Sequence, residues 1–200
     1  MKTHHDYPPL EDLKTNKRIL YAAASLFTVQ GMKGTSMQEI ADKAGISKGL
    51  IYHYYRSKEE IYRCILEEGR ERFHQVVAEV GLKTNPMDRL SSVVSSHLAL
   101  FSDPDPILKL FCRELIQIET GTGDSPAGQF LRCCERTREI ITSGIQEGQI
   151  RPVDPAMASL SIMGMVYFHG LEMLKTPGEE EKERIQHLLE MIRLSLSISL

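Results

Sequence analysis

The sequence predicts an all-α protein with about nine helices. Apolar residues recur at helical spacing through most of the 200 residues, whereas no stretch alternates for long in the manner of a β-strand. Breaks rich in proline or glycine, such as residues 103–106 and 176–178, separate successive apolar stripes. Hydrophobic residues make up 42% of the chain and charged residues 26%, which is typical of a soluble globular protein with a substantial core.

The first helix is expected to follow a flexible arm formed by residues 1–12, in which a Tyr-Pro-Pro sequence resists helix formation. It begins near Thr15 and is closed by Gly31. Its apolar stripe consists of Ile19, Leu20, Ala23, Leu26 and Phe27. A stripe of this kind needs a partner, and the two short helices that follow can supply one.

Two short helices around a tight turn are predicted next. Ser36 is an N-cap, and Glu39 three residues later completes a capping box. Gly45 follows where the helix must stop, because glycine tolerates the left-handed conformation found at helix ends. Ser47 is a second N-cap, which opens a helix over residues 48–54. This pattern is typical of a helix-turn-helix, whose second helix would enter a DNA major groove with its N-terminal residues foremost.

Six further helices are predicted after Ser57, which is the next N-cap. They are expected at about residues 58–80, 87–101, 107–119, 127–148, 156–175 and 179–199. The first is long enough to run from the helix-turn-helix into the following part of the chain. Residues 155–171 are uncharged, but they are interrupted by polar residues and glycines and are shorter than the roughly 20 residues of a membrane span, so we expect a buried helix.

The helix-turn-helix resembles the DNA-binding motif of TetR-type (TetR/AcrR) transcriptional regulators. The residues that carry the resemblance are Thr35, Ile40-Ala41, Ala44-Gly45-Ile46-Ser47-Lys48-Gly49, Tyr52, Tyr54-Tyr55 and Ser57-Lys58. With the helix that begins at Ile19, the resemblance covers about a quarter of the chain, and residues 148–155 also resemble the family's connection into its last two helices. It implies a DNA-binding domain at residues 13–56 and an effector-binding and dimerisation domain at residues 57–200.

Contacts with DNA follow from this resemblance. Lys48 and Gly49 would face base edges, and Gln38 would reach the same groove or a phosphate. The full set of expected DNA-binding residues is Thr35, Ser36, Gln38, Ser47, Lys48, Gly49, Tyr52, His53, Tyr54 and Lys58. The aromatic residues and Lys58 would bind phosphates, while Thr35 and Ser36 would combine capping with phosphate contact. Alternatively, Tyr52 packs in the small core, and Lys48 or Gln38 is a solvated surface residue.

The remaining helices are expected to bind a small-molecule effector and to pair two copies of the chain. Residues that mix apolar walls with a few polar groups could line the effector cavity: His97, Phe101, Phe111, Cys112, Glu114, Met163, Tyr167, Phe168 and His169. The last two helices carry small and apolar residues, and pairing them between two copies would give a four-helix homodimer interface. The alternative is that these stripes form only intramolecular core.

The distribution of charge and the spacing of the cysteines bear on DNA binding, metal binding and cellular location. The net charge is −3, but residues 1–64 hold 10 Lys and Arg against 7 Asp and Glu, so the positive charge lies with the proposed DNA reader. The four cysteines show no Cys-x-x-Cys pair and no metal-ligand spacing with histidine, so no metal or cofactor is expected. They are typical of reduced thiols, and the N-terminus has no signal-peptide pattern, which indicates a cytoplasmic protein.

The sequence therefore predicts a ligand-responsive regulator, most simply a dimeric repressor that binds a palindromic double-stranded DNA operator and is released by a small, largely apolar effector. The alternatives are an all-α ligand carrier or enzyme with an incidental helix-turn-helix, or a dimeric helical scaffold. An enzyme is not expected, since no nucleophile with a base, paired carboxylates in an apolar setting or phosphate loop is evident.

Overall fold

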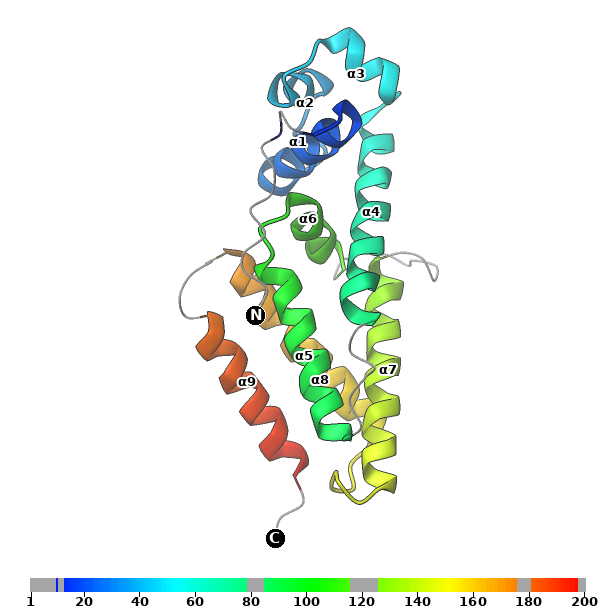
Figure 1. Cartoon of the computed structure of the whole chain (residues 1–200), viewed down its shortest axis with the longest axis vertical. Coiled ribbons are helices and arrows are strands. Elements are labelled where there is room, and N and C mark those ends of the chain that lie inside the picture. The colour runs from blue at the N-terminus through cyan, green and yellow to red at the C-terminus, as the bar shows by residue number, and fades with distance from the viewer. Residues whose placement is uncertain (1–9, 11–12, 79–84, 116–125, 176–180, 198–200) are drawn as a thin grey trace. The chain divides into compact units, whose positions relative to one another are not determined.

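The computed structural model describes residues 10, 13–78, 85–115, 126–175 and 181–197, and in this part of the chain it contains nine α-helices and no strand (Figure 1). This confirms the predicted all-α class. The helices form two compact units, one of residues 1–72 and 104–111 (unit 1) and the other of residues 73–103 and 112–200 (unit 2). The units divide at other points than the expected boundary between residues 56 and 57.

Unit 1 contains α1 (Thr15–Gln30), α2 (Met37–Ala44), α3 (Lys48–Tyr54), most of α4 (Lys58–Ala78) and the first part of α6 (Pro106–Glu114). Its core joins apolar side chains from all five helices. The fully buried members are Ile19, Ala22, Ala23, Ala24, Phe27, Ile40, Ala41, Ile51, Ile61, Ile65, Ile107 and Leu110. The predicted stripe on α1 thus packs against the two short helices, as expected.

A buried carboxylate fixes the start of α6 within unit 1. Asp105 is fully buried, and its Oδ1 accepts a hydrogen bond from the Ile107 N–H at 2.7 Å, which caps α6. Its Oδ2 accepts a hydrogen bond from the Tyr21 hydroxyl at 3.2 Å and forms an ion pair with Arg72. The Arg72 guanidinium also lies 5.5 Å from the Tyr21 ring centroid. Because a buried charge is stable only when it is paired, this network ties α1, α4 and α6 together.

Unit 2 contains α5 (Pro86–Ser102), α7 (Pro126–Gln146), α8 (Pro155–Lys175) and α9 (Glu181–Leu196). Helix α5 packs against the other three. At Gly170 in α8, a β-carbon would lie 2.4 Å from the Phe101 ring, so the absence of a side chain allows α5 and α8 to approach closely. The predicted helix ends near residues 80, 119 and 199 lie outside the described residues.

Helices α8 and α9 bury one face and expose another. Helix α8 is long and apolar enough to cross a membrane by length and composition alone, but 39% of its apolar window is buried in the protein. The expectation of a buried helix is therefore met on one face only. The exposed apolar side chains of the two helices are Met157, Leu160 and Phe168 of α8 and Met191 and Leu194 of α9.

Candidate DNA interface and effector site

The start of α2 is fixed by the predicted capping box. The Ser36 hydroxyl accepts a hydrogen bond from the Glu39 N–H at 3.2 Å, and the Glu39 carboxylate accepts one from the Ser36 N–H at 2.8 Å. Hydrogen bonds from Ser36, and a further one from Gln30, lower the pKa of Glu39 below its usual value. The carboxylate thus stays charged at the helix N-terminus, where a negative charge is favourable.

The turn between α2 and α3 depends on Gly45. This residue has φ 64° and ψ 41°, the left-handed conformation that the sequence predicted, and its N–H bonds back to the last turn of α2. From α1, the Arg18 guanidinium donates hydrogen bonds to the carbonyls of Ala44 at 2.6 Å and Gly45 at 3.2 Å. The turn is therefore held both locally and by a residue 27 positions away in the chain.

Helix α3 begins where the sequence predicted. Ser47 accepts a hydrogen bond from the Leu50 N–H at 3.2 Å, so it caps the helix. Lys48 and Gly49 at its start are exposed, and no atom lies within 4 Å of the position of a β-carbon on Gly49. Tyr52 is 47% exposed, so the alternative that it packs in the small core is wrong. Exposure of this whole edge suits a helix that enters a groove of DNA.

A basic surface groove of about 540 Å³ runs along the start of α2, α3 and the start of α4. It brings together six of the predicted residues: Thr35, Ser36, Gln38, Lys48, Tyr52 and Lys58. Two further cations line it, Lys33 and Arg56, against a single carboxylate, Glu59. Ser47, Gly49, His53 and Tyr54 are exposed on α3 or at its cap and do not line this groove. We name it the basic groove.

Two of the expected phosphate ligands already have partners in the protein. Thr35 is buried, and its hydroxyl donates to the Gly31 carbonyl at 2.9 Å, so Ser36 alone caps α2. The Lys58 amino group donates to the carbonyls of Lys33 at 3.3 Å and Thr35 at 3.0 Å. An ammonium group has three donors, so Lys58 holds this loop in place and keeps one N–H for a further acceptor.

Three residues of this site were not predicted from the sequence. Lys33 and Arg56 are cations immediately outside the two motif helices, and counting charges on the flanking loops would have found them. Arg18 could not have been found in that way, since its role depends on a contact between α1 and the turn.

Comparison with known proteins gives two matches along the chain. Residues 19–65 match the family described as bacterial regulatory proteins, tetR family, and residues 83–169 match the tetracyclin repressor-like C-terminal domain. This chain belongs to the TetR family of transcriptional regulators. The first match contains α2, α3 and the turn between them, and the second covers much of unit 2.

Individual relatives of this TetR-family chain are distant. The HTH-type transcriptional regulator RutR of Escherichia coli (strain K12) is 25% identical over 139 residues, which cover 70% of this chain and 66% of RutR, just under two thirds. The HTH-type transcriptional repressor KstR2 of Mycolicibacterium smegmatis is 23% identical over 153 residues, 72% of this chain and 71% of KstR2. Among solved structures, AibR in complex with isovaleryl coenzyme A and operator DNA has a TM-score of 0.73 and 26% identity, covering 90% of this chain and 97% of AibR.

The residues expected to line an effector cavity in this TetR-family chain do not all lie together. His97, Phe101, Cys112, Met163 and Tyr167 are buried in unit 2, and Glu114 is buried there beside Arg113. Phe111 belongs to unit 1, where its ring packs against Gly69 of α4. Phe168 is 68% exposed and His169 is exposed, so the expectation that these two line an interior cavity is wrong. Both lie on the side of α8 that faces away from the core of unit 2.

The buried members form an aromatic and polar cluster. The Tyr167 ring contacts those of Phe101 and Phe130, with centroids 5.3 and 4.9 Å apart. His97 bonds through Nδ1 to the Val93 carbonyl at 2.7 Å, and its Nε2 lies 3.2 Å from the Cys133 sulfur. Burial lowers the pKa of His97 to about 4 and raises that of Cys133 to about 12. Both side chains are therefore neutral near pH 7.

In unit 2, three buried polar atoms have no hydrogen-bond partner among the described residues. They are the Tyr167 hydroxyl, the Gln129 Nε2 and the Ser102 hydroxyl. Buried polar groups in folded proteins are nearly always satisfied, and each exception calls for an explanation. A ligand that carries hydrogen-bond acceptors would explain the unpartnered donors of Tyr167 and Gln129.

Proposed function

We propose that this chain is a homodimeric repressor that binds a palindromic DNA operator through α3 and the basic groove, and that a small, largely apolar effector releases it. The observation that carries this proposal is the basic groove itself. There, one capped helix presents Lys48 and Tyr52 beside the cations of Lys33, Arg56 and Lys58. Membership of the TetR family supports it, since both matched segments are regulator domains.

Base recognition is assigned to the first residues of α3. Lys48 is the first residue of the helix and is exposed, so its ammonium group can donate to guanine O6 or N7 in the major groove. Gly49 has open space around it, which lets the helix approach the bases closely. Gln38 donates to the Asp42 carboxylate at 2.7 Å, so it must exchange this contact to bind adenine or a phosphate.

Phosphate binding is assigned to the rest of the basic groove. Lys33, Arg56 and Lys58 lie at its rim, and the Tyr52 hydroxyl supplies one directional hydrogen bond. Contacts of this kind fix the position of a protein on the duplex and make its affinity fall with salt.

Dimerisation is assigned to the exposed apolar stripe of α8 and α9. On α8, Met157, Leu160 and Phe168 share a face with Gly164, around which there is open space. Met191 and Leu194 extend the apolar surface on α9. Two copies joined through this stripe would form a four-helix interface with two recognition helices, as a palindromic operator requires. Phe168→Glu is expected to convert the dimer into a monomer on size-exclusion chromatography.

The effector is assigned to the buried cluster of unit 2. Two of its unpartnered atoms, in Tyr167 and Gln129, are donors, so the effector would combine an apolar body with at least one acceptor. AibR was solved with isovaleryl coenzyme A, whose thioester carbonyl is such an acceptor. Acyl-coenzyme A thioesters are therefore the first compounds to test as effectors.

We also propose that the chain works in the cytoplasm, without catalysis and without a cofactor. Its relatives are named as transcriptional regulators, and a DNA-binding role requires access to the genome.

The test is selection of duplexes from a random DNA pool by the purified full-length protein, before and after removal of any co-purified small molecule. The proposal predicts enrichment of a palindrome with half-sites about one helical turn apart and an affinity that falls steeply with salt. A folded dimer that enriches no sequence in either state would overturn it, in favour of a ligand carrier or scaffold.

A further inference from the structure

Leu50 is an exposed apolar residue in the helix to which base recognition is assigned. It is the third residue of α3, directly after Lys48 and Gly49, and it is 39% exposed. A single exposed leucine is ordinary on a protein surface, but this one stands beside the residues that would face base edges. It does not line the basic groove. A role for Leu50 in DNA binding must therefore differ from phosphate binding.

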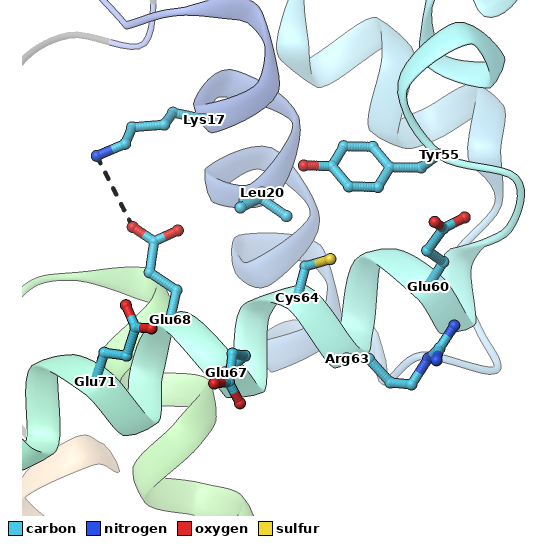
Figure 2. Close-up of a pocket in the computed structure, with 9 residues that line it drawn as sticks. All are labelled: Lys17, Leu20, Tyr55, Glu60, Arg63, Cys64, Glu67, Glu68 and Glu71. Carbon is cyan, nitrogen blue, oxygen red and sulfur yellow. Dashed lines mark ion pairs between the residues drawn. The ribbon is translucent and has the colours of Figure 1, made fainter.

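The rotation of α3 about its own axis is fixed by two buried side chains one turn apart. Ile51 is fully buried in the core of unit 1, and Tyr55, the C-cap of α3, is only 9% exposed. Figure 2 shows the Tyr55 ring directed toward Leu20 of α1 and Cys64 of α4. Leu50 precedes Ile51 by one residue, so it is rotated by about 100° from this buried face. The core thus holds α3 in an orientation that keeps Leu50 at the surface.

The backbone at Leu50 is fixed as well. Its N–H donates to the Ser47 hydroxyl at 3.2 Å and to the Ser47 carbonyl at 3.0 Å. Beyond the turn of helix to which Gly49 belongs, no atom of the described chain lies within 4 Å of the position that a β-carbon would take there. The surface beside Leu50 is therefore open. Leu50 can approach a base edge without rearrangement of α3, which lowers the cost of binding.

The chemistry of the leucine side chain restricts what it can recognise. This side chain has no hydrogen-bond donor or acceptor, so it gains free energy by covering apolar surface. In the major groove the base edges present mainly donors and acceptors, and their apolar group is the C5-methyl of thymine. The sugar-phosphate backbone is charged and polar, which suits Lys58 and Tyr52 instead. A thymine methyl group is therefore the feature of a DNA duplex that matches Leu50.

We propose that Leu50 determines specificity for a thymine in each half-site of the operator by covering its 5-methyl group. The inference rests on the proposed function and deepens it, because it names a base that the operator must contain. Lys48, which is assigned to guanine, lies two residues before Leu50 in α3. The guanine and the thymine are therefore expected close together in each half-site.

The test replaces thymine by deoxyuridine, one position at a time, in the duplex selected by the full-length protein. Deoxyuridine lacks only the 5-methyl group and keeps every hydrogen-bonding group of thymine. Because burial of one methyl group is worth about four-fold in affinity, one position in each half-site should show this loss by fluorescence anisotropy, and substitution in both half-sites should cost about fifteen-fold. At that position, Leu50→Ala should bind the thymine and deoxyuridine duplexes within about 1.5-fold of each other.

The matched control is Leu131→Ala, which truncates a 63% exposed leucine on α7 and should keep the wild-type loss at the same position. A loss on deoxyuridine substitution that persists in Leu50→Ala would overturn the inference. So would a selected palindrome in which no thymine methyl group affects the affinity. Either result would leave a sequence-specific DNA-binding protein, whereas failure to enrich any sequence would overturn the proposed function and this inference with it.

A second measurement adds the methyl group back to a different base. The assigned thymine–adenine pair is replaced by cytosine–guanine, and then by 5-methylcytosine–guanine, which differs from it by the methyl group alone. The wild type should bind the methylated duplex about four-fold more tightly than the unmethylated one, and Leu50→Ala should bind both equally. Equal binding of the two duplexes by the wild type would contradict a direct contact and assign the effect of deoxyuridine to DNA shape.

Discussion

The two units treat their buried polar groups differently. In unit 1 the Asp105 carboxylate is completely buried, and three groups in α1, α4 and α6 satisfy it. In unit 2 the Tyr167 hydroxyl, the Gln129 Nε2 and the Ser102 hydroxyl are buried without a hydrogen-bond partner in the part of the chain that the structure describes. Among the described residues, unit 1 has one such atom, the Arg18 Nε, in a guanidinium group whose Nη2 donates twice. Unit 1 therefore satisfies its buried polar atoms almost entirely within itself, whereas unit 2 holds buried hydrogen-bond donors that another molecule could bind.

The exposed surfaces of the two units also differ, since one is charged and the other is apolar. Unit 1 exposes cations and tyrosines along the basic groove, which suits a polyanion. Unit 2 exposes a stripe of large apolar side chains on α8 and α9, which suits a second copy of the chain. The binding partner of each unit can therefore be inferred from the groups that the unit leaves unsatisfied. In unit 1 these groups are charges, and in unit 2 they are apolar side chains and hydrogen-bond donors.

The largest effect is expected from breaking the complete network of unit 1. Asp105→Asn removes the fully buried carboxylate that pairs with Arg72, which then keeps only its half-buried partner Glu68, and should lower the free energy of unfolding by about 3 kcal/mol, measured by urea denaturation. The control is Glu67→Gln, which breaks an exposed pair with Arg70 and should leave the midpoint nearly unchanged. Equal, small effects of both substitutions would show that the Asp105 network does not hold unit 1 together.

A smaller effect, confined to unit 2, is expected from pH. The pKa of His97 is about 4 in the folded chain and 6.5 ordinarily, so the unfolded state binds more protons between these values. The contribution of His97 to the free energy of unfolding is fully present above about pH 6.5 and is lost as the pH is lowered. At ~1.4 kcal/mol per pH unit below pH 6.5, the loss between pH 7 and pH 5 is about 2 kcal/mol.

The groups that face His97 are the Cys133 thiol, whose pKa burial raises to about 12, and the more distant charge of Arg136. His97→Gln should therefore remove most of the loss between pH 7 and pH 5 in urea denaturation. A variant that loses as much stability as the wild type would assign the pH dependence to another group.

A still smaller effect is expected at the N-cap of α2. Ser36→Ala removes the hydroxyl that accepts the Glu39 N–H and is expected to cost about 1 kcal/mol. Ser36→Thr keeps an oxygen at this position and should retain most of the stability. Amide hydrogen exchange in the first turn of α2 would report the change directly, and unchanged exchange in Ser36→Ala would mean that the cap contributes little.

The smallest effect is expected at Tyr167, where it can be compared directly with Tyr21 because the same Tyr→Phe substitution is made in each unit. Tyr21→Phe deletes a hydroxyl that donates to Asp105 and should cost about 1 kcal/mol. Tyr167→Phe deletes a buried hydroxyl without a partner and should leave stability unchanged or slightly raised. Both values come from the same denaturation experiment. A larger loss in Tyr167→Phe than in Tyr21→Phe would contradict the contrast between the units.

Features that depend on neighbours in the sequence could be predicted. The capping box of Ser36 and Glu39, the left-handed Gly45 and the N-cap at Ser47 each act within a few residues, and the structure confirms all three. The helix at residues 48–54 was correctly predicted because residues next to it in the sequence determine where it begins and ends.

Features that depend on distant contacts could not be predicted. Arg18 bonds to a carbonyl 27 positions away, and Asp105 belongs to unit 1 through Tyr21, 84 positions away. The errors at Phe168 and His169 have another cause. Helix α8 is apolar on nearly all sides, so the period of its sequence does not indicate which face packs against the core.

The central claim is that α3 and the basic groove read DNA. The most direct test is the affinity of the full-length protein for its selected duplex, measured by fluorescence anisotropy, for wild type, for Lys48→Ala combined with Tyr52→Phe, and for Lys182→Ala on α9. We expect the double variant to bind the duplex about 100-fold more weakly than the wild type while it remains a folded dimer. The affinity of the α9 control should change less than two-fold. Unchanged affinity in the double variant would contradict the assignment of α3 as the reading helix.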